Sequence, residues 1–410
     1  MTMTLREEAL KMHLENNGKI SVVSKVPIAN RHDLSVAYTP GVAEPCKDIK
    51  ENKDLSFEYT CRGNMVAVIS DGTRVLGLGD IGPEAAIPVM EGKAALFKTF
   101  SDVDAVPICL GTKDPDEFIR TVKLLEPNYA GINLEDISSP KCYDIECRLK
   151  EICDIPVFHD DQHGTAIACL SAVIGALRYV KKDFRTARFV VNGCGAAGSA
   201  IGRLLVSMGA QNVIMVDRFG ALYEGIDANL DRIQSYLASV TNKERRQGTL
   251  ADVAKGADVL IGVSAPHVFT KEIMQSMAAG SVVFALANPV PETSYDEAKA
   301  AGVAVAGTGR SDRPNQVNNV TVFPGVFRGA IDVRARAITE EMKVAAVFAI
   351  SELIDEKDLR EDYVVPDAFD PRVAPAVAAA VAKTAIELGL ARKIVDPEVV
   401  RANTMKRVGR

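Results

Sequence analysis

Acidic side chains follow two apolar segments of the sequence, and their spacing is the clearest sign of chemistry in the chain. One segment ends at Phe158 and continues as His159-Asp160-Asp161-Gln162-His163-Gly164, and the other ends at Leu134 and continues as Glu135-Asp136. Several carboxylates at one point repel one another unless a cation neutralises them or one of them takes up a proton. Because an all-oxygen ligand set suits Mg²⁺ or Mn²⁺, we expect a divalent cation here. The competing interpretation is that each acidic pair caps a helix or lies in a solvated turn.

The two histidines in this run stand four residues apart, a spacing that allows zinc binding when both lie on one helix. The apolar run before His159 has the composition of a strand, however, and Gly164 disfavours an early helix start. We therefore expect His159 and His163 to be hydrogen-bonding neighbours of the site and not its metal ligands.

Strands must bring these carboxylates together. The runs 129–134 and 155–158 are short and apolar, and the stretch 164–179 has the composition of a helix. In a parallel sheet, side chains at the carboxyl ends of the strands face one crevice. Two further strand-like runs, 65–69 and 104–110, enclose a helical stretch at 85–100. This alternation predicts that the first half of the chain is an α/β layer.

A glycine-dense segment at 74–83 precedes the helical stretch, and the chain must turn tightly there or approach another element closely. Gly92 lies inside the expected helix, where glycine is unfavourable. We therefore expect a crowded position at Gly92, next to Lys93. On its own, Lys93 has the ordinary interpretation of a solvated lysine on a helix face.

The N-terminal region contains a further helical pattern and one tyrosine of interest. The pattern covers residues 5–16 and is amphipathic. Its apolar face consists of Leu5, Ala9, Leu10 and Leu14. Tyr38 stands just before a turn marked by Pro40-Gly41. A tyrosine beside a turn is ordinarily a packing residue, and nothing in the local pattern alone makes it catalytic.

The second half of the chain contains a glycine motif typical of dinucleotide binding. A strand-like run at 188–192 precedes the motif, and a helical run at 199–208 follows it. A Gly-x-Gly-x-x-Gly turn between a strand and a helix lets the backbone approach a pyrophosphate at the helix N-terminus. The residues expected to contact the cofactor in this turn are Gly193, Gly195, Ala196, Ala197 and Gly198.

The choice between NAD and NADP depends on the end of the next strand-like run, 212–216. Asp217 follows this run, about 20 positions after the glycines, as in dinucleotide-binding folds. An acidic residue there accepts hydrogen bonds from the ribose hydroxyls, which favours NAD. Arg218 comes next and could meet the 2′-phosphate of NADP, so the sequence leaves that cofactor open.

Two asparagines later in the chain could bind a ligand carboxylate. The strand-like runs 258–264 and 281–287 continue the second sheet, and the latter leads into Asn288. Asn319 stands before another apolar run. The alternative for both asparagines is turn formation. From residue 335 onward the chain is rich in alanine, and we expect helices that pack back on the cofactor domain.

Composition bounds the class of protein. The chain has 410 residues, 47% hydrophobic and 25% charged, which predicts a soluble globular protein of two domains. A net charge of −6 with mixed signs gives no electrostatic footprint for nucleic acid. The polar N-terminus predicts no signal peptide, and we expect no apolar run of membrane-spanning length. The eight cysteines lack a paired Cys-x-x-Cys frame, which predicts reduced thiols in a cytoplasmic enzyme.

Six segments together resemble the malic enzyme family, in particular its small bacterial members. They occur in the family's order, span nearly the whole chain and are far more specific jointly than any one of them. The segments are Tyr-Thr-Pro-Gly-Val-Ala at 38–43, Gly-Leu-Gly-Asp-Ile-Gly-Pro at 77–83, Glu-Gly-Lys at 91–93, Asn-Leu-Glu-Asp at 133–136, Phe-His-Asp-Asp-Gln-His-Gly-Thr at 158–165 and Gln-Val-Asn-Asn-Val at 316–320.

The resemblance implies a role for each candidate residue. Lys93 would be the general base, Asp160 its partner, and Tyr38 the general acid. The residues that would bind the metal are Glu135, Asp136 and Asp161, and those that would bind the substrate are Arg74, Asn288 and Asn319, with Asn288 also touching the cofactor. One extra residue separates Arg74 from Lys93 relative to the larger members of the family.

The resemblance also implies an architecture and an activity. We expect an α/β fold with an N-terminal α/β substrate and metal domain at 1–162. A Rossmann-type doubly wound dinucleotide-binding domain with a helical C-terminal tail would follow at 163–410. The expected reaction is the divalent-metal-dependent oxidative decarboxylation of (S)-malate to pyruvate and CO₂ with reduction of NAD or NADP, in a homo-oligomer, most simply a dimer. The alternatives are a malolactic-type enzyme, a non-decarboxylating malate dehydrogenase, and a non-catalytic NAD-binding sensor.

Overall fold

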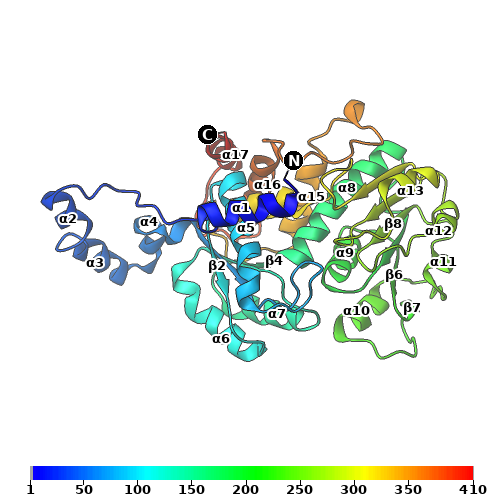
Figure 1. Cartoon of the computed structure of the whole chain (residues 1–410), viewed down its shortest axis with the longest axis horizontal. Coiled ribbons are helices and arrows are strands. Elements are labelled where there is room, and N and C mark those ends of the chain that lie inside the picture. The colour runs from blue at the N-terminus through cyan, green and yellow to red at the C-terminus, as the bar shows by residue number, and fades with distance from the viewer. Residues whose placement is uncertain (1–2, 410) are drawn as a thin grey trace.

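Two β-sheets, each accompanied by helices, form the body of the protein (Figure 1). The computed structural model describes residues 3–409. The first sheet has the order β2-β1-β3-β4, with β1 (Met65–Ser70), β2 (Asp104–Cys109), β3 (Gly131–Leu134) and β4 (Val157–His159), all parallel. The second has the order β10-β9-β8-β5-β6-β7, with β5 (Arg188–Asn192), β6 (Asn212–Asp217), β7 (Gly220–Ala221), β8 (Val259–Gly262), β9 (Val282–Ala285) and β10 (Val305–Thr308). Only the pairing of β6 with β7 is antiparallel among these strands, so the expected α/β class is confirmed.

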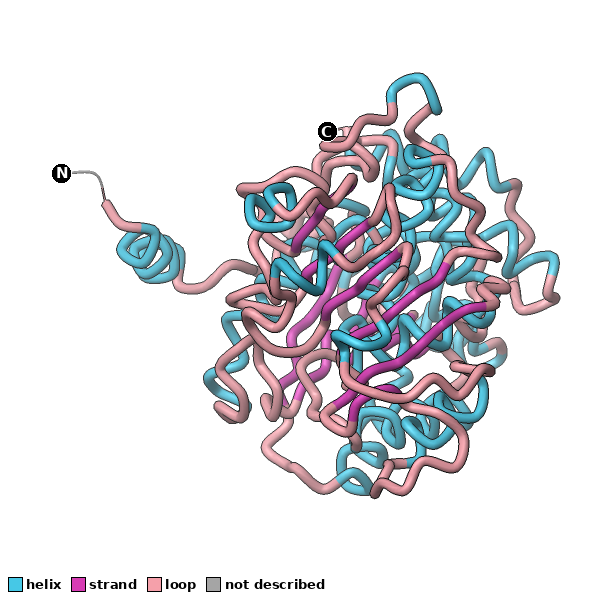
Figure 2. Tube along the Cα trace, turned by 90° about the vertical axis from the view of Figure 1, so that its right-hand side faces the viewer, coloured by secondary structure: helices cyan, strands magenta, loops and turns pink. Residues whose placement is uncertain are grey.

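Helices connect the successive parallel strands, because parallel neighbours require a long crossover. Figure 2 shows the strands lying among helices and loops. In the first half the connecting helices are α5 (Pro83–Ser101), α6 (Pro115–Leu125) and α7 (Lys141–Ile152). In the second half they are α9 (Ala196–Ser207), α10 (Arg232–Val240), α11 (Leu250–Val253), α12 (Lys271–Gln275) and α13 (Tyr295–Ala300).

The strands expected from the apolar runs are all present, and their ends lie within two residues of the expected ones. The strand β10 was not expected from the sequence. Its residues, Val-Ala-Gly-Thr, include Gly307, which has a low strand propensity. The reason for the glycine is packing, since a Cβ atom at Gly307 would lie 2.5 Å from the Phe284 ring.

A single π-helical turn, η4 (Asp160–Gly164), joins the two halves of the chain and continues directly into α8 (Thr165–Val180). Helix α8 therefore starts within one residue of its expected start, but the helical turn before it was not expected, and the boundary expected after residue 162 falls inside this turn. Glycine at position 164 does not end the helix. It makes room for the Asp160 carboxylate, because a Cβ atom there would lie 1.8 Å from Asp160 Oδ1.

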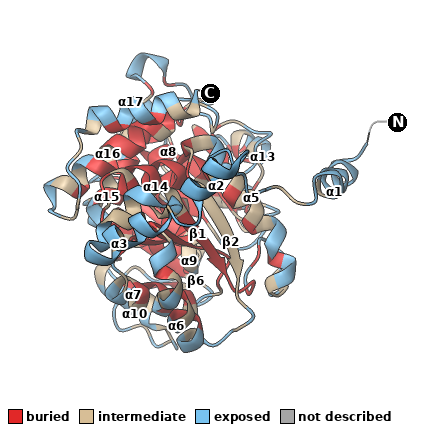
Figure 3. Cartoon of the chain, turned by 90° about the vertical axis from the view of Figure 1, so that its left-hand side faces the viewer, coloured by how far each residue is buried: buried red, intermediate tan, exposed pale blue. Residues whose placement is uncertain are grey.

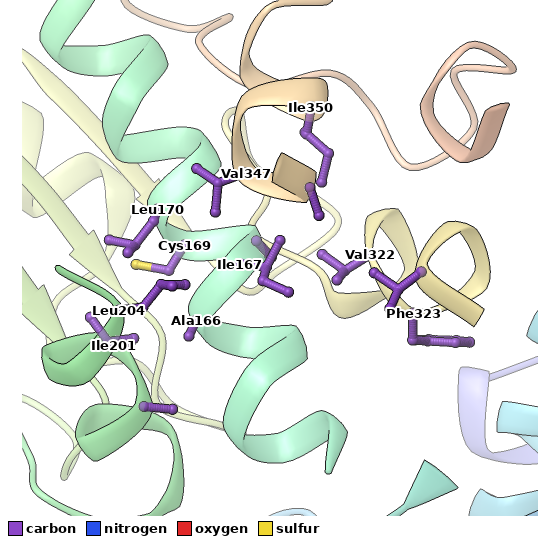
Figure 4. Close-up of a cluster of buried hydrophobic side chains, with 14 of the residues drawn as sticks. Ala166, Ile167, Cys169, Leu170, Ile201, Leu204, Val322, Phe323, Val347 and Ile350 are labelled. Carbon is purple, nitrogen blue, oxygen red and sulfur yellow. The ribbon is translucent and has the colours of Figure 1, made fainter. Parts of the chain in front are cut away.

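Helix α8 forms the centre of the largest apolar cluster (Figure 4). Figure 4 shows side chains of α8 (Ala166, Ile167, Cys169 and Leu170) among those of α9 (Ile201 and Leu204) and of the C-terminal segment (Val322, Phe323, Val347 and Ile350). The expectation that no apolar run reaches membrane-spanning length was wrong. The helical stretch Asp160–Val180 has the length and composition needed to cross a membrane, but most of it is buried inside the protein as a core helix.

The C-terminal helices cover both halves of the molecule. They are α14 (Phe323–Asp332), α15 (Glu340–Ser351), α16 (Val373–Glu387) and α17 (Pro397–Val408). Helix α15 packs on α8 and α9, as expected, but α14 and α17 also pack on α5 of the first half. Aromatic rings fix that contact, since Phe97 of α5 lies 4.6 Å from Phe323 and 5.3 Å from Phe327 between ring centroids. The expectation of packing on the cofactor domain alone was therefore incomplete.

The N-terminal helices lie outside this core. They are α1 (Leu5–Asn16), α2 (Arg31–Ala37), α3 (Ala43–Glu51) and α4 (Ser56–Tyr59), and none of them contains a buried residue. Figure 3 shows α1 extending away from the body, and Figure 1 shows α2 and α3 projecting from it. Helix α1 has the expected bounds, but its expected apolar face is exposed, with Leu5 at 82% and Leu14 at 78%.

Two helical glycines give a test of this packing. The expectation that Gly92 is crowded was wrong, because a Cβ atom there would have no heavy atom within 4 Å. At Gly175 of α8 a Cβ atom would lie 1.9 Å from the Val364 carbonyl oxygen. Gly92→Ala should therefore stabilise the protein by about 0.5–1 kcal/mol through helix propensity. Gly175→Ala should destabilise it by about 1–3 kcal/mol through overpacking.

The opposite effects on stability that we expect from the two substitutions can be measured by scanning calorimetry of both variants and the parent chain. Each substitution adds one methyl group to one helix, so each variant is the control for the other. A lower melting temperature for Gly92→Ala would mean that another surface covers that position.

Candidate active site

The carboxyl ends of β3 and β4 bring the two acidic pairs together, as expected from the sequence. The strands are parallel neighbours, and Leu134 pairs in register with His159. Glu135 and Asp160 are therefore the next residues of adjacent strands. Both are buried, at 4% and 0% exposure.

The ammonium group of Lys93, from α5, lies between these two carboxylates. Lys93 Nζ is 2.7 Å from Asp160 Oδ2 and 3.0 Å from Glu135 Oε1. It also lies 4.4 Å from the centroid of the Phe323 ring, which adds a cation–π contact. The expectation of a solvated lysine is excluded by this geometry. The pairing of Lys93 with Asp160, which the family resemblance implied, is present.

Asn319 belongs to the same group. Its Nδ2 atom donates to Asp160 Oδ2 at 2.9 Å, and its side chain also pairs with the Thr165 hydroxyl at 3.2 Å. Asn319 therefore fixes the orientation of the Asp160 carboxylate. From the other strand, Asn133 Nδ2 donates to Glu135 Oε1 at 2.7 Å.

Burial and mutual repulsion shift the pKa values of this group. Burial, followed by repulsion from neighbouring carboxylates, raises the pKa of Glu135 well above its usual value and raises that of Asp136 to about 7. The pKa of Asp160 is raised by burial as well, although Lys93 opposes the shift. Burial disfavours the charged form of Lys93, but Asp160 and Glu135 outweigh it and raise the pKa of this lysine. A base role therefore requires further positive charge nearby.

A hydrogen bond connects the second residues of the two acidic pairs, Asp136 and Asp161. Asp161 Oδ2 accepts a hydrogen bond of 2.8 Å from the Asp136 backbone N–H. Asp136 has a φ angle of 55°, a left-handed conformation that is uncommon outside glycine. The Asp136 carbonyl in turn accepts from the Arg74 backbone N–H at 2.9 Å. Backbone contacts thus connect the glycine-dense segment to the acidic site, while the Arg74 side chain itself is exposed.

In this arrangement the acidic side chains do not form a complete set of metal ligands. Among residues 3–409, no three His, Cys, Asp or Glu side chains are arranged to hold an ion directly. The reason lies in the present partners, since Glu135 faces Lys93 and Asn133 while Asp161 faces the Asp136 backbone. The donor set nevertheless fits a hard divalent cation, because it consists of carboxylate oxygens alone. Buried polar atoms without a hydrogen-bond partner gather here, including Asp136 Oδ2 and Asp160 Oδ1.

The two histidines of the run differ in their contacts. His163 Nε2 lies 2.7 Å from Glu146 Oε1, and His163 Nδ1 lies 3.0 Å from Lys343 Nζ. His163 is therefore a hydrogen-bonding neighbour, as expected. The same expectation was wrong for His159, because both of its ring nitrogens lack a hydrogen-bond partner within the described chain. Its Nδ1 atom lies 3.8 Å from Asp161 Oδ2.

The glycine motif has the geometry of a dinucleotide turn. Gly193 has a φ angle of 112°, and a Cβ atom at Gly198 would lie 1.8 Å from the Gly193 carbonyl oxygen. A Cβ atom at Gly195 would meet nothing within 4 Å, so the turn is open at that point. Helix α9 begins at Ala196, with Ala197 next, and no side chain caps its N-terminus. Its free backbone N–H groups suit a pyrophosphate.

Asp217 ends β6 beside this turn, as expected. It accepts hydrogen bonds from the side chain of Gln234 and, at 2.7 Å, from the backbone N–H of Arg218. The Arg218 guanidinium makes no ion pair with Asp217 and instead lies 4.8 Å from the centroid of the Phe219 ring. Asp217 thus has no ion-pair partner in the described part of the chain.

The two halves meet near Asn288. A Cβ atom at Gly77, in the glycine-dense segment, would lie 2.5 Å from Pro289 Cδ and 3.2 Å from the Asn288 carbonyl oxygen. The close approach expected of that segment is therefore real, and it occurs across the two halves. The Asn288 side chain is exposed next to this contact.

Tyr38 is not brought to the acidic site by its own chain. It caps α2, is 65% exposed, and belongs to a region that projects from the body (Figure 1). Lys93 and Asp160 lie at the end of the first sheet instead.

Sequence reasoning missed three residues of this site. Asn133 stands two positions before Glu135, and residues at i and i+2 of a strand share a face, so this spacing could have identified it. Glu146 and Lys343 contact His163 from α7 and α15. No local pattern identifies them, because their contact with His163 depends on the packing of distant helices.

Comparison with known proteins agrees with this geometry. The sequence profile of the malic enzyme N-terminal domain matches residues 17–150, and that of the malic enzyme NAD-binding domain matches residues 162–386. The bifunctional malic/malolactic enzyme of Bacillus subtilis is 56% identical over 404 residues, which cover 98% of both chains. The NAD-dependent malic enzyme of Geobacillus stearothermophilus is 50% identical over 95% of this chain and 81% of its own.

Structural comparison and further relatives agree. The crystal structure of malic enzyme from Pyrococcus horikoshii superposes with a TM-score of 0.96 at 45% identity, over 99% of this chain and 96% of that one. Relatives at 44–47% identity include proteins named NADP-dependent malic enzymes. With both domain profiles and relatives of nearly the same length in agreement, this chain belongs to the malic enzyme family.

Proposed function

We propose that the protein oxidises (S)-malate with NAD and releases CO₂ from the product, so that pyruvate is formed with the help of a divalent cation. The contact between the acidic site and the dinucleotide turn carries this proposal. The turn η4, which contains Asp160 and Asp161, packs against α9, which begins at the glycine motif. A buried lysine–carboxylate group beside a hydride acceptor is what the oxidation of a hydroxy acid requires.

Glu135, Asp136 and Asp161 would hold Mg²⁺ or Mn²⁺. Support comes from their oxygen-only donor set, from the unpartnered Asp136 Oδ2 atom and from the mutual repulsion of the carboxylates. When bound, such a cation offsets the negative charge around Lys93 and, as a Lewis acid, stabilises the charge that develops on the substrate oxygen as CO₂ leaves.

Lys93 would accept the proton of the C2 hydroxyl of malate. As the O–H bond breaks, hydride leaves C2 for C4 of the nicotinamide ring, and C2 becomes a carbonyl carbon. Asp160 holds the Lys93 ammonium group in place for this step, and Asn319 orients the Asp160 carboxylate. Because the surrounding carboxylates raise the pKa of Lys93, the lysine must give up its own proton before it can act as a base.

The loss of CO₂ breaks the bond between C3 and C4 and leaves its electron pair on the enolate of pyruvate. Protonation at C3 completes the reaction. We assign this step to Tyr38, whose phenol is the candidate acid. Arg74 and Asn288, both exposed, would bind the substrate carboxylates, and Asn288 would also touch the cofactor.

The Tyr38 assignment requires a second copy of the chain. The N-terminal arm, which we define as residues 3–42, exposes many apolar side chains, among them Val22, Val23, Val26, Ile28, Leu34 and Val36. An apolar surface of this extent is typical of a protein interface. We infer that the arm lies on a second copy in a homodimer and that Tyr38 completes the site of that copy.

Asp217 favours NAD over NADP. Its carboxylate is positioned by Gln234 and can accept from ribose hydroxyls, while it would repel a 2′-phosphate. Arg218 is held over Phe219 and is not committed to an anion. The eight cysteines are all free, in keeping with the reducing cytoplasm that we propose as the location.

A malolactic reaction is the second candidate, and the bifunctional name of the 56% identical relative favours it. In that reaction the hydride returns from the reduced nicotinamide to C2 of pyruvate before release, and the net products are lactate and CO₂. It would use the same residues and differ in how long NAD stays bound.

The activity can be tested with malate, NAD or NADP, and Mn²⁺, following the absorbance of reduced nicotinamide and identifying the products. We expect pyruvate and CO₂, with no turnover after chelation of the metal. Because a charge-assisted hydrogen bond to the ribose contributes about 1.5–3 kcal/mol, kcat/KM should favour NAD by about tenfold or more. Oxaloacetate as final product would contradict decarboxylation, lactate without net reduction of NAD would identify the malolactic reaction, and a preference for NADP would contradict the role of Asp217.

The roles of Lys93 and Tyr38 can be tested together. Lys93→Ala and Tyr38→Phe should each lose about 10²–10⁴-fold in kcat, as expected for a general base or acid, while both variants still bind NAD. When the two inactive proteins are mixed and re-associated, half of the dimers are mixed, and each mixed dimer has one intact site if Tyr38 acts across the interface. The mixture should then recover about a quarter of the parent activity.

Each variant re-associated with itself is the control for that experiment. A mixture that stays inactive although gel filtration detects mixed dimers would show that Tyr38 does not act across the interface. Unchanged turnover in Lys93→Ala would exclude this lysine as the base.

The metal assignment predicts a specific loss in Asp161→Ala. Partners of metal ligands already contribute tenfold or more to affinity, so loss of a ligand should raise the Mn²⁺ concentration for half-maximal activity by at least about tenfold. Mn²⁺ should also raise the melting temperature of the parent protein but not that of the variant, because a bound ion stabilises the folded state.

Asp116→Ala, at a carboxylate that is 80% exposed and lies outside the site, is the matched control. If Asp161→Ala and Asp116→Ala gave the same Mn²⁺ titration as the parent protein, Asp161 would not be a ligand.

A further inference from the structure

A chain of buried polar contacts runs from the C-terminal helix α15 through the turn η4 to helix α7. Lys343 Nζ lies 3.0 Å from His163 Nδ1, and His163 Nε2 lies 2.7 Å from Glu146 Oε1. The exposures of the three residues are 2%, 3% and 5%. Buried charges persist only when they are paired and hydrogen bonded. This series of contacts therefore holds α15, η4 and α7 in one arrangement.

Both ends of the chain are closed by partners nearer the surface. Glu340 Oε1 lies 2.6 Å from Lys343 Nζ, and Lys150 Nζ lies 2.5 Å from Glu146 Oε1. The Glu340 side chain is 46% exposed and that of Lys150 is 30% exposed. The charges therefore alternate along the chain, with a neutral imidazole in the middle.

The geometry fixes the tautomer of the His163 ring. An ammonium group can only donate, so His163 Nδ1 must accept from Lys343. The ring proton is then on Nε2, where it donates to the Glu146 carboxylate. Each of the two ring nitrogens thus has one defined partner.

His163 occupies the same π-helical turn as Asp160 and Asp161, and its ring packs 5.5 Å from the Phe158 ring. The turn leaves little freedom, since Gly164 is in contact with Asp160 and the Gln162 side chain accepts from Arg203 at 3.4 Å. His163 and both carboxylates therefore belong to one tightly packed turn.

We propose that Lys343 is a positioning residue for the carboxylates of η4: by holding His163 in one orientation, it keeps Asp161 directed toward Asp136 and Asp160 toward Lys93. This inference rests on the proposed function only in taking those carboxylates as the metal site. No hydrogen bond or ion pair joins Lys343 to Glu135, Asp136, Asp160 or Asp161 in residues 3–409, so its effect on the site passes through His163. Its action resembles that of residues outside the ligand set that orient metal ligands through hydrogen bonds, and such residues contribute 10–100-fold to metal affinity.

The test is Lys343→Met, which keeps the length and apolar stem of the side chain and removes the ammonium group. Mn²⁺ affinity is measured without substrate, by the electron paramagnetic resonance signal of the free ion. We expect the Mn²⁺ dissociation constant to rise about 10–100-fold. The NAD dissociation constant should stay within about twofold, because no hydrogen bond or ion pair joins the side chains of Lys343, His163 or Glu146 to residues 193–198 in the described part of the sequence.

Glu340→Gln is the matched control. It neutralises the half-exposed outer partner of Lys343 and leaves the contact with His163 in place. Exposed ion pairs contribute at most about 1 kcal/mol, so its effect on Mn²⁺ affinity should stay within a fewfold. A folded Lys343→Met protein with the Mn²⁺ affinity of the parent chain would overturn the proposal.

A measurement on the parent protein makes the proposal independent of how the variant folds. The ¹⁵N chemical shifts of His163 should identify a neutral ring protonated at Nε2, and a ring protonated at Nδ1 would overturn the proposal. The outcome is also separable from the proposed function. A parent protein that binds Mn²⁺ but does not oxidise malate would refute that function without affecting the comparison of the two Mn²⁺ affinities.

Discussion

The charge of one ammonium group, held between two buried carboxylates, is the constraint on which the rest of this structure depends. Asp160 and Glu135 cannot both remain ionised in the interior without a counter-charge, and Lys93 supplies it at 2.7 and 3.0 Å. The surrounding structure serves that arrangement. Two adjacent parallel strands deliver the acids, helix α5 delivers the lysine, and Phe323 from α14 closes the group from the C-terminal side. Because burial already disfavours every charge in this group, small changes in one member alter the protonation of the others.

The turn η4 links this electrostatic group to cofactor binding. A regular α-helix starting at Thr165 would leave the residues before it in a loop, whereas the wider π-helical turn brings Asp160, Asp161 and His163 into one rigid unit. That unit packs on α9, whose N-terminus carries the dinucleotide turn. The acidic site and the dinucleotide turn are therefore connected through the packing of η4 on α9.

Much of this arrangement could be predicted from the sequence because it depends on local pattern. Apolar runs identified the strands, and the glycine spacing identified the dinucleotide turn. The position of the acids at two strand ends predicted their convergence, since parallel strands share an edge. The start of α8 was expected within one residue of its observed position, but the helical turn η4 before it was missed because Gly164 was interpreted as disfavouring an early helix start. The absent side chain of Gly164 instead makes room for Asp160.

Other features could not be predicted because they depend on contacts between distant segments. Gly92 was interpreted as crowded from helix propensity alone, and only the packed structure shows open space around it. Lys343 is 180 residues from His163 in sequence, and no periodicity in α15 distinguishes it from a surface lysine. The N-terminal arm is exposed, and the spacing of the apolar residues in α1 does not reveal whether its partner belongs to the same chain.

The residues in these contacts are far apart in the sequence, which has a consequence for folding during protein synthesis. The ion pair of Lys93 with Asp160 spans 67 residues, and the contact of His163 with Lys343 spans 180. A growing chain that ends before α15 therefore has both sheets but lacks the contact of Lys343 with His163. Contacts between residues that lie far apart in the sequence form late during folding. A nascent chain should accordingly acquire its dinucleotide turn well before its acidic residues reach their final orientation, so the two binding sites mature in a fixed order.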